Sequence, residues 1–244
     1  MSTLATLAEL RRHLGLRADE TSDDDRLLTT LEAASAELER ECGRRFEPRL
    51  ASITHIISQS TDTLSLADDL LELTALYDAG GAIPLEAVTR IPADSPAALL
   101  RLAEGLYFMA GEVTVTGWWG WNDDPPTLWA ATGQTVQDDP LQAAADQVTV
   151  AEPAAFSPGQ LLRLDSEVLR VTVVPATPGP IHVLRAQCGT EAASHSQGTA
   201  VKSCAPPPDV RDLVLRWAAW LTRRAEPLPD ALRQPARRWR RERV

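Results

Sequence analysis

The sequence predicts an α+β protein: a helical core made by a long second helix and a C-terminal helix, a layer of short strands, and an inserted small all-β barrel or sandwich domain. Apolar residues recur at helical spacing near both ends of the 244-residue chain. Between these ends apolar and polar residues alternate, and turns rich in glycine and proline separate the alternating segments. A chain of this length can bury a sizeable core, as one large domain or two small ones.

The N-terminal segment predicts a helical hairpin. Leucines three or four residues apart share one face of residues 4–14, where Thr6 and Glu9 have capping-box spacing and Gly15 is a natural stop. A second helix is expected after an acid-rich turn and continues to about Arg45. Its buried stripe is expected to consist of Leu27, Leu28, Leu31, Ala34, Leu38 and Cys42.

From Arg49 the apolar period changes to two, which predicts strands. Short strands are expected in the segments ITHIIS, TLSL, LLELTALYD, IPLEAVTRI and GEVTVTG. The segment DDLLELTALYD fits either a helix or a strand. Thr74, Tyr77 and the following Gly80–Gly81 favour a strand that ends in a turn.

A second region of strands follows a predicted boundary. The segment WNDDPPTLWAATGQTVQDDPLQAAADQ is expected to be a loop because it is rich in Pro, Asp and Gly. Strands are then expected at about 147–151, 160–164, 167–174 and 180–186. Their spacing fits a small barrel or sandwich.

The chain returns to helix after the prolines at 206–208. The apolar stripe of this helix is expected to consist of Val210, Leu213, Val214, Trp217, Trp220 and Leu221. The arginine-rich end that follows is interrupted by proline and is expected to be extended until a partner orders it. The expected domains are therefore a core of residues 1–128 completed by 204–226, a β domain over 129–203, and a tail over 227–244.

The net charge of −10 is unevenly distributed. From Asp209 to the end, ten arginines stand against five carboxylates, so the rest of the chain carries −15. An acidic body repels nucleic acid at long range, whereas a basic end can hold phosphates or an acidic partner. Three scattered cysteines predict no disulfide framework, and neither a secretory leader nor a membrane span is expected.

The sequence has no recognisable catalytic motif, so neither a catalytic residue nor a cofactor is expected. The pairs Asp68–Asp69, Asp123–Asp124 and Asp138–Asp139 could be imagined as acid–base groups or Mg²⁺ ligands. Aspartates at turns are favoured by hydrogen bonds to their own backbone, which is the preferred interpretation. A metal site is not expected either, because four possible ligands lack a usual spacing: His182, Cys188, His195 and Cys204.

Tryptophans and arginines are the remaining candidate binding residues. Trp118, Trp119 and Trp121 could form a platform for a sugar or a base. Packing in the core or against a neighbouring subunit is favoured for them, and also for Trp217 and Trp220. A basic cluster could contact DNA phosphates or an acidic protein groove. It consists of Arg223, Arg224, Arg233, Arg237, Arg238, Trp239, Arg240 and Arg241.

In their order these segments resemble the head–tail connector family of tailed phages, the adaptors that sit under the portal. The N-terminal part of the resemblance is the run LAELRRHLGL…SDDDRLLTTLEAASAELERECGRRFEP. Further parts are Asp69–Ala75, Gly80–Gly81, Val113–Trp121 and the final helix Asp209–Arg224. Short family members pass directly from the Gly-Trp strand to the last helix, so the β segment is an insertion.

The resemblance implies a structural virion protein with no catalytic activity and no cofactor. Copies of the chain, twelve by family resemblance, would form a ring between the portal and a tail, stopper or tail terminator protein. Double-stranded DNA would pass through the ring without sequence-specific contact, and no membrane would be involved. The protein would lie at the head–tail interface of the virion, and in the host cytoplasm during assembly. The alternative is a glycan- or nucleic-acid-binding module that uses the Gly-Trp stretch or the arginine-rich end.

Overall fold

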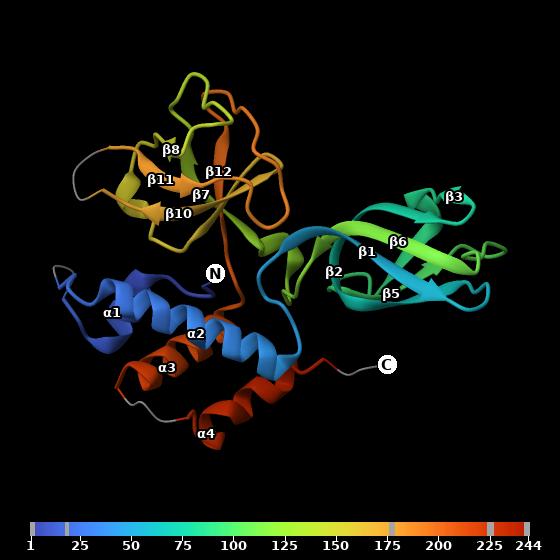
Figure 1. The fold of residues 1–244 in the computed structure, drawn as a ribbon, viewed down its shortest axis with the longest axis horizontal. Coiled ribbons are helices and arrows are strands. Elements are labelled where there is room, and N and C mark those ends of the chain that lie inside the picture. The colour runs from blue at the N-terminus through green and yellow to red at the C-terminus, as the bar shows by residue number, and fades with distance from the viewer. Residues whose placement is uncertain (1–2, 18–19, 176–178, 224–226, 242–244) are drawn as a thin grey trace. The chain divides into compact units, whose positions relative to one another are not determined.

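The structure is a computed structural model that describes residues 3–17, 20–175, 179–223 and 227–241 (Figure 1). The chain divides into two compact units. Unit 1 contains Met1–Cys42 and Thr127–Arg240, and unit 2 contains Gly43–Pro126 and Arg241–Val244.

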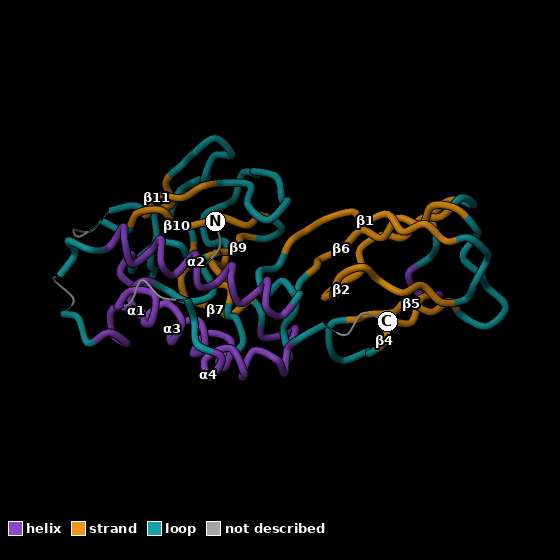
Figure 2. The backbone as a smooth tube through the Cα atoms, turned by 60° about the horizontal axis from the view of Figure 1, so that its bottom comes forward, coloured by secondary structure: helices purple, strands orange, loops and turns teal. Residues whose placement is uncertain are grey.

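The α-helices of the described residues belong to unit 1, where they are drawn in purple in Figure 2. They are α1 (Leu7–Leu14), α2 (Asp24–Cys42), α3 (Pro208–Arg223) and α4 (Asp230–Arg233), and the 3₁₀ helix η4 (Gln234–Trp239) follows α4 directly. The predicted capping box at the start of α1 is confirmed, since Thr6 and Glu9 satisfy each other's backbone N–H groups. Gly15 ends α1 in the left-handed conformation with φ 75°, as expected for a C-cap glycine.

Leucine and tryptophan side chains join α2 to α3. Leu27, Leu31 and Leu38 of α2 are fully buried, and so is Trp217 of α3. Both helices are amphipathic with the predicted apolar stripes, so their stability comes mainly from packing these faces together.

Unit 1 also contains a six-stranded antiparallel sheet with its own hydrophobic core. The strands are β7 (Trp129–Thr135), β8 (Gln147–Val148), β9 (Leu161–Leu164), β10 (Glu167–Val173), β11 (Ile181–Leu184) and β12 (Ala200–Cys204), in the order β7-β12-β9-β10-β11-β8. A 3₁₀ helix, η3 (Pro153–Ala155), lies between β8 and β9. We call residues 127–204 the β module. The four predicted strands after residue 147 are present, whereas the prediction of a loop at WAATGQT was wrong, because this segment is β7 and pairs with β12.

Unit 2 contains a second antiparallel sheet, whose strands precede those of the β module along the chain. Its strands are β1 (Arg49–Ile57), β2 (Thr63–Asp78), β3 (Gly81–Ala82), β4 (Val88–Ile91), β5 (Ala97–Leu102) and β6 (Gly111–Trp119). The order is β1-β6-β2-β5-β4, and β3 pairs with the end of β2. Two 3₁₀ helices, η1 (Leu85–Ala87) and η2 (Pro125–Thr127), complete the elements of this region.

The long strand β2 connects the two halves of this sheet. Its first residues pair with β5, and from Leu70 onwards it pairs with β6, with register shifts between Ser65 and Leu70 and again after Leu70. The segments TLSL and LLELTALYD are therefore one strand rather than two. The preference for strand over helix in DDLLELTALYD is confirmed.

These strands have their own apolar core. Its fully buried members include Leu70, Phe108, Val115 and Trp119. The prediction of a mixed α and β protein is confirmed, but the protein is rich in β structure. The prediction of a helical core that carries a layer of short strands was wrong, because the strands of residues 49–119 enclose their own core.

Gly117 permits the close approach of β6 to β2. A Cβ atom on Gly117 would lie 2.1 Å from the backbone oxygen of Glu72, and backbone cannot move aside as a flexible side chain can. We expect Gly117→Ala to lower the free energy of unfolding by about 3 kcal/mol or more, measured by chemical denaturation. Gly80→Ala is the matched control, because its Cβ would meet the flexible Met109 side chain instead. Equal stability of the two variants would contradict this account of the β2–β6 contact.

Candidate functional site

The arginine-rich end of unit 1 is folded against the helices, in contrast to the extended tail expected from the sequence. The indole Nε1 of Trp217 on α3 donates a hydrogen bond to the carbonyl of Leu232 at 2.8 Å. The Cys42 thiol lies 3.5 Å from the carbonyl oxygen of Ala236. Ala236 and Trp239 are buried. The prolines that suggested an extended chain here begin and interrupt short helices.

Two arginines of this segment are neutralised by carboxylates of α2. Arg233 pairs with Glu37 at 3.1 Å and with Glu41 at 3.3 Å. Arg240 also binds Glu41. The hydrogen bond from Arg240, and the positive charges of Arg240 and Arg233, lower the pKa of Glu41 against the opposing effect of burial. These pairs fix the segment to α2, so these two side chains already have partners.

The other members of the predicted basic cluster have different surroundings. Arg238 pairs with Asp209 and lies over the ring of Trp239, 3.9 Å from its centroid. The side chains of Arg223 and Arg237 are exposed. Arg224 lies outside the described residues.

Arg241 belongs to unit 2 rather than to this cluster. Its guanidinium donates to the carbonyls of Leu66 and Ala67 at 2.7 and 2.6 Å, and it lies 3.5 Å from Asp68. The structure therefore divides the predicted cluster: Arg233, Arg238 and Arg240 are bound within unit 1, Arg241 within unit 2, and Arg223 and Arg237 face solvent.

The Gly-Trp stretch is part of the core of unit 2. Trp119 is fully buried, and its Nε1 donates to the carbonyl of Ala51 at 2.8 Å. Trp118 is also buried, while Trp121 is half-buried. The Trp121 ring meets Phe46 edge-on at 5.7 Å, and the Arg44 guanidinium lies 5.4 Å from its centroid. A sugar or base platform needs exposed faces, which the two buried rings do not offer.

The pair Asp68–Asp69 lies within β2, so the expected turn was wrong, although the expected local hydrogen bond is present, from the backbone N–H of Asp69 to the carboxylate of Asp68 at 2.9 Å. Asp69 is buried, which raises its pKa, and the charge of Arg44 at 3.4 Å partly opposes that rise. Asp68 pairs with Arg49 at 3.0 Å. Both carboxylates therefore serve arginine pairing in unit 2.

Two of the remaining predicted aspartates take part in local hydrogen bonds. Asp138 accepts hydrogen bonds from the backbone N–H and the hydroxyl of Thr149, both at 2.8 Å. The backbone N–H of Asp124 donates to the side-chain oxygen of Asn122 at 2.8 Å. Within the described ranges, no group of three His, Cys, Asp or Glu residues could hold a metal ion.

A buried charged cluster in the β module was missed by the sequence analysis. Glu167 is fully buried, and Arg185 binds it with two hydrogen bonds of 2.7 Å. The ring nitrogens of His195 lie 2.9 Å from Glu167 and 2.9 Å from Asp165. The backbone N–H of Ala193 also donates to Glu167, at 3.0 Å. The cluster ties the loop around residue 193 to the start of β10.

Arg185 extends this cluster to a second loop, since it donates to the carbonyls of Gln142 and Ala145 at 2.8 and 3.0 Å. Such an arrangement holds loops in place and leaves no open position for a substrate at the carboxylate. The sequence contained one signal for it, a glutamate at the start of a mainly apolar strand. Its partners lie 18 and 28 residues further along the chain, at separations no local pattern reveals.

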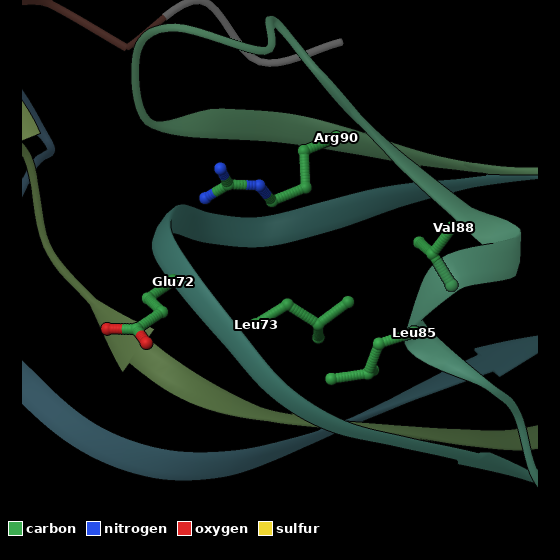
Figure 3. Close-up of a pocket in the computed structure, with 5 residues that line it drawn as sticks. All are labelled: Glu72, Leu73, Leu85, Val88 and Arg90. Atoms are coloured by element: carbon green, nitrogen blue, oxygen red, sulfur yellow. The ribbon is translucent and has the colours of Figure 1, made fainter.

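One shallow pocket lies on unit 2, with a volume of about 240 Å³. It is lined by Glu72 and Leu73 of β2, Leu85 of η1, and Val88 and Arg90 of β4. Leu73 and Leu85 point toward one another across it (Figure 3). The pocket is smaller than the sites that usually hold cofactors or small-molecule ligands. No described helix is long and apolar enough to cross a membrane.

Burial of Trp239 gives a test of the docked end. We expect Trp239→Ala to lower the free energy of unfolding by about 3 kcal/mol, because it leaves a large cavity beside α2 and α3. Arg237→Ala, two residues away and exposed, is expected to change stability by less than about 0.5 kcal/mol. Denaturant titration of both variants measures the difference. A Trp239→Ala protein as stable as the parent would show that the end does not pack.

The Glu167 cluster predicts an acid-labile β module. Despite burial, the hydrogen bonds from Arg185, Ala193, His195 and Ala186 lower the pKa of Glu167 from 4.5 to about 2. A lowered carboxyl pKa contributes stability that is complete above pH 4.5 and disappears as the pH falls through about 2. We expect a loss of about 3 kcal/mol over this range.

The measurement for this prediction is the free energy of unfolding as a function of pH. In Glu167→Gln most of that contribution should already be missing at neutral pH, and the acid-dependent part should be smaller. Glu191→Gln, an exposed glutamate, is the control and should follow the parent. The same acid dependence in Glu167→Gln as in the parent would contradict the assignment.

Comparison with known proteins finds a family similarity in the N-terminal segment. Residues 4–74 match the family model of phage gp6-like head-tail connector proteins. A chain in the neck of an empty GTA particle, computed with C6 symmetry, aligns with 99% of this chain and 91% of its own, at 17% identity and a TM-score of 0.39. No curated protein matches. The resemblance predicted from the sequence is thus confirmed: residues 4–74 carry the signature of the phage gp6-like head-tail connector family.

Proposed function

We propose that the protein is a structural connector of a phage-like virion. Copies of it, twelve by family resemblance, form a ring that binds the portal on one side and a tail, stopper or tail terminator protein on the other. The observation that carries this proposal is the match of residues 4–74 to the head-tail connector model. This segment includes α1, α2 and β1 and most of β2, so it contributes to both units. Assembly in the host cytoplasm and residence at the head–tail interface follow from this role.

The charge distribution supports passage of DNA through such a ring. Outside the last 36 residues the chain carries −15, which offers phosphates no electrostatic attraction. Phosphate contacts would bind DNA with a salt-dependent affinity and would hinder its movement. We therefore propose that DNA passes without sequence-specific contact, and we propose no catalytic role.

We propose that the exposed arginines of the helical end bind the portal. Arg223 and Arg237 face solvent, whereas Arg233 and Arg240 are occupied by Glu37 and Glu41. Arginine forms strong paired hydrogen bonds with carboxylates, so an acidic groove of the portal is the expected target. Because the segment is already folded, binding would not need to order an extended tail, and the associated entropy cost would be smaller.

A nucleic-acid-binding role is the second candidate, and the same arginines favour it. It predicts a DNA affinity that falls steeply with salt concentration and is lost when both arginines are replaced. The glycan-binding alternative has less support, because Trp118 and Trp119 are buried.

Charge reversal tests the portal contact. We expect Arg223→Glu with Arg237→Glu to weaken portal binding at least tenfold, which corresponds to about 1.4 kcal/mol or more. Stability should be nearly unchanged, because both side chains are exposed. The measurement is the affinity for purified portal by calorimetry or biolayer interferometry.

Arg26→Glu on α2 is the control, since it reverses another exposed arginine of unit 1 and should leave portal affinity unchanged. Point variants are preferable to removal of residues 227–244, because that truncation would also remove Trp239 and uncover Trp217. Unchanged portal affinity in the double variant would refute the role of these arginines.

A further inference from the structure

Unit 2 exposes a group of large apolar side chains at one end of its sheet. The group consists of Ile56, Tyr77, Leu106, Tyr107 and Met109, and we call it the apolar tip. Ile56 is 83% exposed and Tyr107 is 62% exposed. Both tyrosines of the sequence and its one methionine after Met1 are in this group. Tyrosine and methionine are enriched where proteins bind each other, so an exposed group of this composition indicates an interface.

Strand pairing brings these residues to the same end of the sheet. Ile56 pairs with Glu112 at the start of β6, and Tyr77, at the end of β2, pairs with Thr114 two residues later. Ile56 and Tyr77 therefore lie on the same face, since residues two apart on a strand point the same way.

The loop before β6 adds the rest of the tip. The backbone N–H of Met109 donates to the carboxylate of Asp78 at 2.8 Å, beside Tyr77. The Met109 sulfur lies 2.8 Å from the position of a Cβ atom on Gly80, so this side chain covers the turn between β2 and β3. Leu106 and Tyr107 precede it in the same loop.

The surroundings of the tip are mainly acidic, and the exposed Arg101 at the end of β5 is the nearby exception. Residues 50–89 and 102–162 contain no lysine or arginine, and these ranges supply all five members of the tip. Asp62, Glu104 and Glu112 are exposed beside it. A surface that binds the tip should therefore combine apolar side chains with positive charge and lack carboxylates.

The β module has an exposed apolar surface that includes one arginine, and the exposed Asp146 lies near it, since its backbone carbonyl accepts from the N–H of Val183. Apart from unit 2, the exposed large apolar side chains of the described residues are Val173 and Leu184, each 52% exposed. Leu184 pairs across strands with Arg170, and Val173 pairs with His182. Between Glu167 and Glu191 there is no carboxylate. We call these four residues the β10–β11 face.

We propose that the apolar tip of one copy binds the β10–β11 face of a second copy. The contact rests on the proposed ring-forming function and names the surfaces that would make it. A contact between two tips would bring the carboxylates of Glu104 and Glu112 of one copy near those of the other, and their like charges would repel. The two surfaces are different, so each copy can give a tip and receive one. Such a head-to-tail contact produces a closed ring when the rotation that relates neighbouring copies adds up to a full turn.

A mixing experiment with exposed substitutions tests this contact. Tyr107→Asp adds a carboxylate to the tip, and Leu184→Asp adds one to the β10–β11 face. We expect each variant alone to associate at least tenfold more weakly than the parent, because a new charge must be buried in an apolar contact. Sedimentation velocity over a concentration series gives the association of each protein, and circular dichroism confirms the fold.

The mixture of the two variants distinguishes a head-to-tail contact from other arrangements. Each variant keeps one intact surface, so an equimolar mixture should form a one-to-one complex and nothing larger. Leu85→Asp is the matched control, since Leu85 is exposed on unit 2 outside the tip and its variant should associate like the parent.

The proposal would be overturned by a parent protein that stays monomeric throughout the concentration series, or by single variants that associate like the parent. A mixture of the variants that does not form the one-to-one complex would also overturn it. Equal loss in Leu85→Asp would overturn it as well. Portal binding by the same variants separates the two proposals. Failure of the tip contact with intact portal binding would leave the connector role in place, whereas loss of portal binding in Arg223→Glu with Arg237→Glu does not bear on the tip.

Discussion

The packing of the arginine-rich end on α2 decides which charges the protein can offer to a partner. Trp217 holds the backbone of Leu232, and Glu41 accepts from both Arg233 and Arg240. An arginine paired within its own chain must give up that partner before it can bind another protein, at a cost comparable to what it would gain. Only those arginines that the packing leaves in solvent can bind a portal without this cost. The same packing joins the last residues of unit 1 to α2, which lies within the family signature.

In unit 2 the corresponding constraint is the close approach of β6 to β2 at Gly117. Two residues further along β6, Trp119 is buried in the core, and its indole nitrogen donates to the carbonyl of Ala51 on β1. The Gly-Trp stretch is therefore a packing device that closes one end of the sheet. At the opposite end the ring of Phe108 is buried, whereas Ile56 and the neighbouring Tyr107 remain in solvent. A partner at that end would bury surface that the fold itself leaves uncovered.

Local patterns in the sequence were sufficient for much of this fold, and they failed where distant residues decide the structure. The capping box at Thr6, the apolar stripe of α3 and the strand at Leu70–Tyr77 depend on neighbours within a few residues, so they were predictable. The strand β7 was not, because most of its side chains are half-buried or exposed and it is recognised only through pairing with β12. Likewise, the docking of the arginine-rich end depends on Glu41, about 200 residues earlier. The Glu167–Arg185–His195 cluster joins the start of β10 to residues 18 and 28 positions further along the chain in the same way.

The charges of the chain suggest why a ring subunit would have two unlike surfaces. A self-complementary contact needs one surface that matches its own copy, and it closes after two subunits. The acidic apolar tip does not match itself, and neither does the β10–β11 face with Arg170 beside Leu184. A contact between the tip of one copy and the β10–β11 face of another buries both apolar surfaces and brings opposite charges together. Because the two surfaces differ, such a contact gives the ring a direction. A directional contact allows more than two copies to form a closed ring around an axis. Residues 43–126 of unit 2 contain five arginines and twelve carboxylates, so the net charge of this unit repels DNA. In the proposed ring, the same acidic unit would join the copies and would leave the DNA free to pass.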